Sequence, residues 1–187
     1  MAKPVDARNP LAHKFWMRLV TFRPKDGTDR LGALIESDAA VVDLTAARDE
    51  APFRSMLALM EAGPDALAAA RRTVADPPSA AVLDTANIAL RTPLPQPPQI
   101  RDCLCFEEHL IQAFTVLRKN RAAAEPDPEA ALIEFEKQGL FQIPEVWYQQ
   151  PIYYKANRLA VIGTEEDVLW PDYAELMDYE LEFGFFM

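Results

Sequence analysis

Two glutamates near the end of the sequence, Glu180 and Glu182, stand two residues apart in an apolar stretch. In a β-strand such residues share a face and lie about 6.6 Å apart, so both carboxylates are expected to point the same way. Tyr179, Leu181 and Phe183 would then face a core. Two carboxylates that lose water repel each other unless a cation lies between them. Oxygen ligands indicate a hard divalent ion, Mg²⁺, Mn²⁺ or Ca²⁺; a solvated edge strand is the alternative.

A second pair of residues with chemical potential is Asp102 and His109, seven positions apart. Histidine is the usual general base near neutral pH, although a histidine with a purely structural role is the other interpretation. Glu107 and Glu108 beside it could tune its pKa. They could equally serve as the acidic start of a helix, which the helix dipole favours.

The two cysteines, Cys103 and Cys105, are too few for a secreted domain held together by disulfides. The C-x-C spacing lacks the second Cys/His pair that tetrahedral zinc requires. We therefore expect two plain buried thiols, and a cytoplasmic protein.

Composition limits the classes of partner. The 187 residues are 50% hydrophobic and 26% charged, which excludes a disordered chain, and the net charge is −10. An acidic chain with scattered basic residues is a poor ligand for nucleic acid. Apolar runs fall short of the roughly 18 residues that a membrane-spanning helix needs, so no membrane partner is expected. Residues 1–16 lack the apolar core of a secretory signal, and we expect them to be a disordered extension.

The elements that must position these residues divide into two regions. Residues 17–44 show short strands separated by Asp/Gly turns, and residues 53–74 show a helical pattern that Gly63-Pro64 interrupts. A strand pattern over residues 83–94 ends in four closely spaced prolines, which can form neither a helix nor a central strand. We therefore place a domain boundary there and assign residues 17–98 to a small lead-in domain with a proline-rich connector.

The second domain is expected over residues 99–187. A helix is predicted over residues 106–119, followed by a polar excursion over residues 118–139 that is either a surface insertion or a mobile flap. Strands are predicted from residue 146, over residues 159–163 and over residues 179–187. The expected fold class is α+β and rich in β-structure.

Three stretches of this sequence resemble the fumarylacetoacetate hydrolase family: residues 101–109 (RDCLCFEEH), 150–158 (QPIYYKANR) and 178–186 (DYELEFGFF). The resemblance extends from Met17 onward and implies a lead-in domain followed by the first part of a mixed β-roll catalytic domain, in a homodimer. It implies that Asp102, Glu180 and Glu182 are metal ligands, with Mg²⁺ first, and that His109 activates water. Substrate oxygens would meet Tyr154 or its neighbour Tyr153, and Lys155.

The sequence departs from the family pattern at three places. Leu104 stands where the fumarylacetoacetate enzyme has a tyrosine, so a different substrate is expected. Gln112 stands where small members have the glutamate partner of the histidine. The family also supplies a further aspartate ligand from beyond the Glu-x-Glu strand, whereas this sequence stops at Met187. We therefore expect an N-terminal fragment of a larger member, truncated in the catalytic domain.

The resulting hypothesis is a metal-dependent hydrolase that cleaves a carbon–carbon bond in a 1,3-dicarbonyl or 2-oxo acid, such as fumarylacetoacetate or an acylpyruvate. The metal would polarise the carbonyl and stabilise the departing enolate while His109 takes a proton from water. The same chemistry serves a 2-oxo acid hydratase, decarboxylase or tautomerase. A catalytically incomplete fragment and a plain interaction domain with a solvated acidic face are the remaining alternatives.

Overall fold

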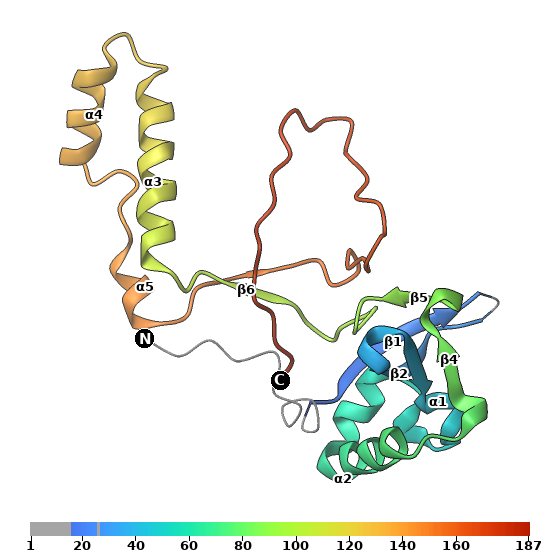
Figure 1. Cartoon of the computed structure of the whole chain (residues 1–187). Helices are drawn as coiled ribbons and strands as arrows, with labels where there is room; N and C mark the ends of the chain where they lie inside the picture. Colours follow the sequence, from blue (N-terminus) through green and yellow to red (C-terminus); the bar gives the residue numbers. More distant parts are fainter. Residues whose placement is uncertain (1–15, 26) are drawn as a thin grey trace. The chain divides into compact units, whose positions relative to one another are not determined.

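The computed structural model describes residues 16–25 and 27–187, so the extension expected at residues 1–16 lies outside the described residues except for Trp16. The chain forms two compact units (Figure 1). The first contains the described residues up to Pro97 together with Leu159–Met187, and the second is Pro98–Arg158. The class is mixed α+β with a curled antiparallel sheet.

Five antiparallel strands make the sheet of the first unit, in the order β4-β3-β2-β1-β5. Their bounds are β1 Arg18–Pro24, β2 Arg30–Ile35, β3 Ala40–Asp43, β4 Val82–Asp84 and β5 Ile88–Arg91. Short connections join β1, β2 and β3 into a meander, as the turn residues predict. Pairing of β1 with β5 places Phe22 opposite Leu90 and brings the chain back beside its first strand.

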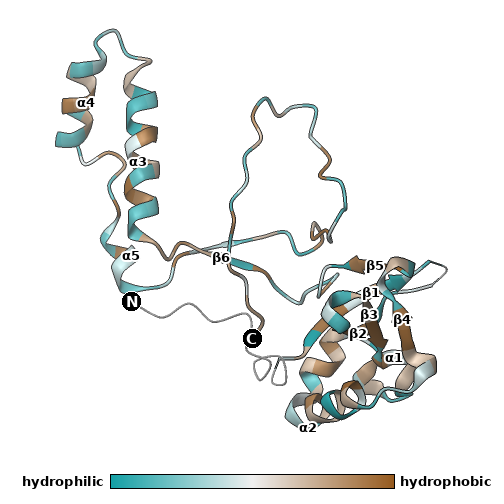
Figure 2. Ribbon diagram, in the orientation of Figure 1, coloured by the Kyte–Doolittle hydropathy of each residue, from teal (hydrophilic) through white to brown (hydrophobic). Residues whose placement is uncertain are grey.

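The core of this unit lies between the sheet and α2, Met56–Ala75. Ser55 caps α2 by accepting a hydrogen bond from the Ala58 amide at 3.1 Å. At Gly63 the backbone adopts φ 76° and ψ −161°, so the helix is kinked at the Gly63-Pro64 step that the sequence predicted as a break. Figure 2 shows apolar residues concentrated in β3 and on α2. The fully buried core residues include Leu31, Ala33, Val42, Leu44 and Ala70.

Short helical turns complete the first unit: η2 Glu36–Asp38, α1 Leu44–Ala47, η3 Ala51–Phe53, η4 Ser79–Ala81 and η5 Thr85–Asn87. Thr45 in α1 links β2 to η3 through its side chain. Its hydroxyl accepts from the Leu31 amide at 3.0 Å and donates to the Phe53 carbonyl at 2.7 Å. Each bond gives a partner to a backbone group of a buried residue.

The strands predicted over residues 159–163 and 179–187 are wrong: residues 156–187 contain no helix or strand. The side chains expected to face a core are exposed instead, with Tyr179 at 87%, Leu181 at 96% and Phe183 at 94%. Alternating residues make a strand possible, but hydrogen bonds to a neighbouring strand are needed to form one. This segment is joined to β5 through an ion pair between Arg91 and Glu166.

The second unit contains β6 Arg101–Cys103, α3 Glu107–Ala122, α4 Pro128–Lys137, α5 Glu145–Gln149 and β7 Tyr153–Lys155. Helices α3 and α4 pack side by side, with Asp127 capping α4 (Figure 1). The strand predicted from residue 146 is wrong over residues 146–149, which belong to α5 after Pro144. Proline at the position before a helix fixes φ near −65° and gives the chain a defined entry into the first turn.

Among residues 16–25 and 27–187, every helix is too short or too polar to cross a membrane.

Candidate active site

The strand pair β6–β7 brings together two of the stretches that the sequence analysis singled out. The antiparallel register places Asp102 opposite Tyr154, Arg101 opposite Lys155, and Cys103 opposite Tyr153. The pairing continues past Cys103, because the Leu104 amide donates to the Ile152 carbonyl at 3.0 Å. Residues separated by about fifty positions in sequence are thus neighbours.

The register also separates the candidate substrate-binding residues by face. Directly opposed residues in an antiparallel pair project from the same side of the sheet, and consecutive residues project from opposite sides. Asp102 and Tyr154 therefore share one face. Tyr153 and Lys155 share the other face, where the Arg101 guanidinium lies 4.6 Å from the centre of the Tyr153 ring.

His109 lies in the first turn of α3, six residues after β6 ends, and its side chain is exposed. Glu107 and Glu108 precede it in the same turn, where two carboxylates are favourable beside the positive end of the helix dipole. Gln112, at the position of the family's glutamate, donates from Nε2 to the Glu108 carboxylate at 3.0 Å. This hydrogen bond joins Glu108 to Gln112, which lies one helical turn further along the same face of α3.

Glu180 and Glu182 belong to the first unit, whereas Asp102 and His109 belong to the second. Both glutamates are exposed and lie in the segment without regular secondary structure. Carboxylates are the oxygen donors that a hard divalent ion takes, so the chemistry of the three acidic residues fits Mg²⁺. Across the described residues, however, no three His, Cys, Asp or Glu side chains are grouped closely enough to hold a metal ion.

The cysteines differ from the expectation of buried thiols. Cys103 and Cys105 are both free and both exposed. Leu104 between them is held through its backbone, since its carbonyl accepts a hydrogen bond from Trp147 Nε1 at 2.9 Å. The prediction failed because β6 and β7 form a two-stranded ribbon in this unit, and such a ribbon has little other structure to cover its faces.

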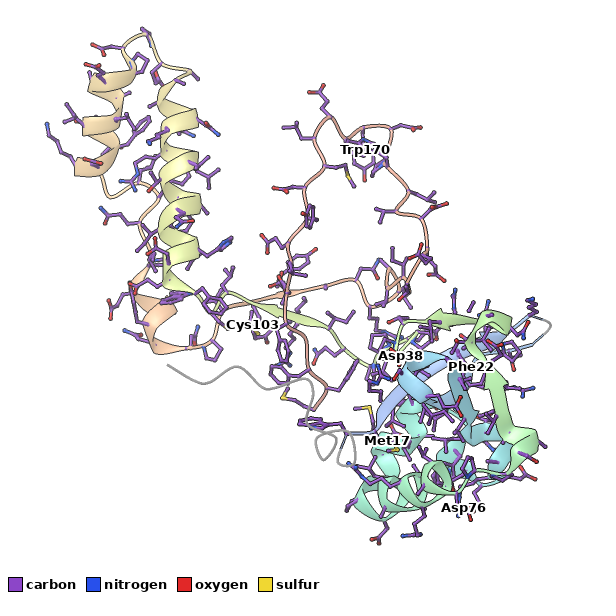
Figure 3. All side chains as sticks on the ribbon, in the orientation of Figure 1. Met17, Phe22, Asp38, Asp76, Cys103 and Trp170 are labelled. Atoms are coloured by element: carbon purple, nitrogen blue, oxygen red, sulfur yellow. The ribbon has the colours of Figure 1, made fainter. Side chains whose placement is uncertain are left out.

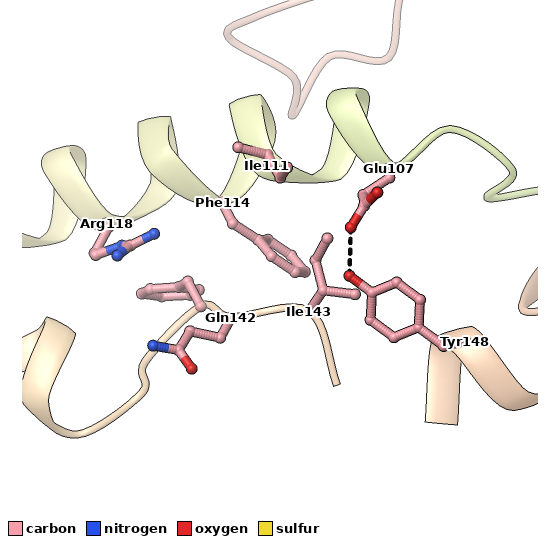
Figure 4. A pocket seen from close by; sticks show the side chains of 8 residues that line it. Glu107, Ile111, Phe114, Arg118, Gln142, Ile143 and Tyr148 are labelled. Carbon is pink, nitrogen blue, oxygen red and sulfur yellow. Dashed lines mark hydrogen bonds between the residues drawn. The ribbon is translucent and has the colours of Figure 1, made fainter. Parts of the chain in front are cut away.

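A pocket of about 270 Å³ lies between α3, α5 and the segment before α5 (Figure 4). Ile111, Phe114, Phe141 and Ile143 give it apolar walls, with the charged groups Glu107 and Arg118 on α3. The Tyr148 hydroxyl donates to the Glu107 carboxylate at 2.5 Å, as Figure 4 shows. That hydrogen bond is the main cause that raises the pKa of Tyr148; partial desolvation and the charges of Glu107 and Glu145 add to it.

The Glu107–Tyr148 pair was not predicted from the sequence, because Tyr148 was expected on a strand. Pro144 before Glu145-Val-Trp-Tyr is the signal that could have indicated a helix start instead.

Comparison with protein-family models gives no match, and comparison with curated proteins gives none either. The family resemblance consequently rests on the motif residues themselves and remains a proposal.

Proposed function

We propose that this chain carries part of the active site of a metal-dependent hydrolase of the fumarylacetoacetate hydrolase type, acting on a 1,3-dicarbonyl or 2-oxo acid. The proposal is based on the register of β6 and β7. This register sets Asp102, the first acidic residue of one motif, directly opposite Tyr154, one of the two adjacent tyrosines of another. The family resemblance assigns residues 101–109 and 150–158 to one active site. Their pairing as neighbouring strands supports that assignment.

In this proposal the acidic residues Asp102, Glu180 and Glu182 would hold a divalent cation, with Mg²⁺ first, as the family resemblance implies. Such a cation would supply polarisation of a substrate carbonyl and would offset the negative charge that develops on it. The phenol of Tyr154 stands on the same face as Asp102 and donates a hydrogen bond to a substrate oxygen. Tyr153 and Lys155 lie on the opposite face and therefore do not take part in this hydrogen bond to the substrate.

His109 is proposed as the general base. An exposed imidazole in the first turn of α3 can take a proton from water near neutral pH. Its place a few residues after Asp102 keeps the base and the first acidic residue on one short stretch of chain. The proposal also includes three features that the family resemblance implies: a homodimer, a β-roll catalytic domain and a cytoplasmic location.

The test is turnover of acylpyruvates, fumarylacetoacetate-like diketo acids and oxaloacetate, with Mg²⁺ and with a chelator. We expect turnover of at least one substrate, lost on chelation and restored by Mg²⁺. His109→Ala should lose turnover while its Mg²⁺ affinity, measured by calorimetry, is retained. Glu129→Gln, an exposed change on α4, is the matched control and should match the wild type.

Absence of both turnover and Mg²⁺ binding in the wild-type chain would overturn the proposal. Full activity of His109→Ala would remove the histidine from the role of base.

A further inference from the structure

Cys103, the last residue of β6, and Cys105, two residues beyond it, form a pair of accessible thiols. Both are free and exposed, and Figure 3 marks Cys103 on the strand. Accessible thiols are the ones that exchange with small disulfides, whereas thiols enclosed in a core are inert.

The backbone around the pair is extended. Cys103 closes β6, Leu104 continues the pairing with Ile152, and Phe106 has φ −111° and ψ 110°. Two residues apart on an extended strand, the Cα atoms are separated by about 6.6 Å and the side chains share a face. Disulfides usually span about 4.4–6.8 Å between Cα atoms, most often about 5.5–6 Å. The Cα separation therefore lies at the upper limit of that range. The Cβ atoms, which point the same way from the strand, are also farther apart than the roughly 3.5–4.5 Å that a disulfide spans. Bond formation therefore requires residues 103–105 to leave the extended conformation and contract.

We propose that Cys103 and Cys105 are a site of reversible disulfide formation with small disulfides such as glutathione disulfide. One cysteine thiolate attacks a sulfur of glutathione disulfide, forms a mixed disulfide and releases one glutathione thiolate. The second cysteine thiolate attacks the protein sulfur of the mixed disulfide, forms the Cys103–Cys105 bond and releases the second glutathione thiolate. The protein loses two electrons and two protons, and glutathione disulfide is reduced to two glutathione molecules.

The contraction acts on Leu104, which lies between the sulfurs. Its amide donates to Ile152 and its carbonyl accepts from Trp147 Nε1 at 2.9 Å, so both bonds depend on the extended geometry. Drawing Cys103 and Cys105 together turns these peptide groups and releases Trp147. A bond that strains its surroundings is also more easily reduced, which makes the oxidised state reversible. This inference is independent of the activity proposed above.

The first experiment equilibrates the full chain in buffers with a rising ratio of glutathione disulfide to glutathione, then blocks free thiols and records intact mass. We expect a product lighter than the reduced protein by two hydrogen atoms, with neither thiol blocked, that dithiothreitol returns to the dithiol. Cys103→Ser and Cys105→Ser are the controls. Each should stop at a mixed disulfide heavier by one glutathionyl group.

The second experiment follows Trp147, which is made the sole tryptophan by Trp16→Phe and Trp170→Phe. Oxidation should shift its emission to longer wavelength, because the indole exchanges the Leu104 carbonyl for water. The shift should reverse with dithiothreitol and be absent when Cys105→Ser is added. Accumulation of doubly glutathionylated or intermolecularly bridged chains instead of the internal disulfide would overturn the proposal. An internal disulfide that leaves Trp147 emission unchanged would overturn the coupling to Leu104.

Discussion

Asp102 and Tyr154 stand directly opposite each other in the antiparallel pair of β6 and β7, on the same face of that pair. Their neighbours in sequence, Cys103 and Tyr153, are also opposite each other but project from the other face. A shift of the register by one residue would exchange the two tyrosines. The pairing of these strands therefore decides which phenol accompanies the acidic residue.

The first prediction uses the two tyrosines as a matched pair. Tyr154→Phe should lower kcat/KM for the preferred 2-oxo acid by about 10- to 100-fold, because it removes a hydrogen-bond donor to charge that develops in the transition state. Tyr153→Phe should change kcat/KM less than about threefold, since the Arg101 guanidinium keeps an aromatic ring beneath it. Steady-state kinetics of both variants check this. Equal losses in the two variants, or a larger loss at Tyr153, would contradict the assignment of faces.

The second prediction concerns the metal. If Mg²⁺ binds the folded chain, it raises the free energy of unfolding by RT ln(1 + [Mg²⁺]/Kd), about 2.7 kcal/mol at a hundred times Kd. Asp102→Asn should lose most of this increase, because an amide oxygen lacks the negative charge of the carboxylate. Thermal unfolding with and without Mg²⁺ measures the effect, with Glu129→Gln as control. An undiminished increase in Asp102→Asn would exclude Asp102 as a ligand.

The third prediction concerns Gly32 in β2, whose place in the core leaves no room for a side chain. A Cβ atom there would lie 2.7 Å from Val41 Cγ2, 2.8 Å from the Phe22 ring and 2.9 Å from the Val42 carbonyl oxygen. Gly32→Ala should therefore destabilise the first unit by about 1–3 kcal/mol, the usual cost of overpacking. Denaturant unfolding followed by circular dichroism measures it. Gly184→Ala is the control, because nothing lies within 4 Å of a Cβ at that position.

The fourth prediction compares two aspartates that each accept one hydrogen bond from a nearby backbone amide, three residues on for Asp43 and two residues on for Asp84. Asp43 and Asp84 each accept a backbone hydrogen bond at 2.8 Å, from the Ala46 and Ala86 amides. Asp43 is in addition 1% exposed and forms an ion pair with Arg30 at 2.8 Å. Asp43→Ala should cost about 2–4 kcal/mol, because the Arg30 guanidinium and the Ala46 amide both lose their partner and the buried carboxylate leaves a cavity.

Asp84→Ala should cost only about 0.5–1 kcal/mol, the value of a cap in contact with water. Denaturant midpoints of the two variants give the comparison. Equal costs would show that burial of Asp43 contributes nothing beyond the cap.

The fifth prediction concerns pH. The hydrogen bond to Glu107, with partial desolvation and the charges of Glu107 and Glu145, raises the pKa of Tyr148 in the folded chain. A raised folded pKa means that the contribution of this pair to stability is complete below the unfolded pKa of about 10 and is lost as pH rises through the folded pKa. Glu107→Gln should bring the pKa of Tyr148 back toward its ordinary value. Tyrosinate absorbance during alkaline titration, with Tyr148→Phe to identify the signal, measures the shift; an unchanged titration in Glu107→Gln would contradict it.

Local patterns predicted the meander of β1, β2 and β3 and the interrupted helix of the first unit, because these elements are defined by nearby residues. Asp/Gly turns separate three strands that pair in order, and Gly63-Pro64 breaks the helical pattern where α2 is kinked. Such features act over a few positions, so an isolated sequence contains them. The cysteines and residues 146–149 were predicted wrongly, since burial and the choice between helix and strand depend on what packs around them.

For the candidate site, the amino-acid sequence is enough to identify the residue types: three acidic side chains, one imidazole and two adjacent tyrosines with a lysine. The pairing of Tyr154 with Asp102, the exposure of the thiols and the lack of a strand over residues 179–187 follow from the folded chain. Pairing and burial are properties of two segments in contact, so one segment alone cannot specify them. A periodic pattern in one segment shows which face it can offer, but the identity of the segment that meets this face depends on the rest of the fold.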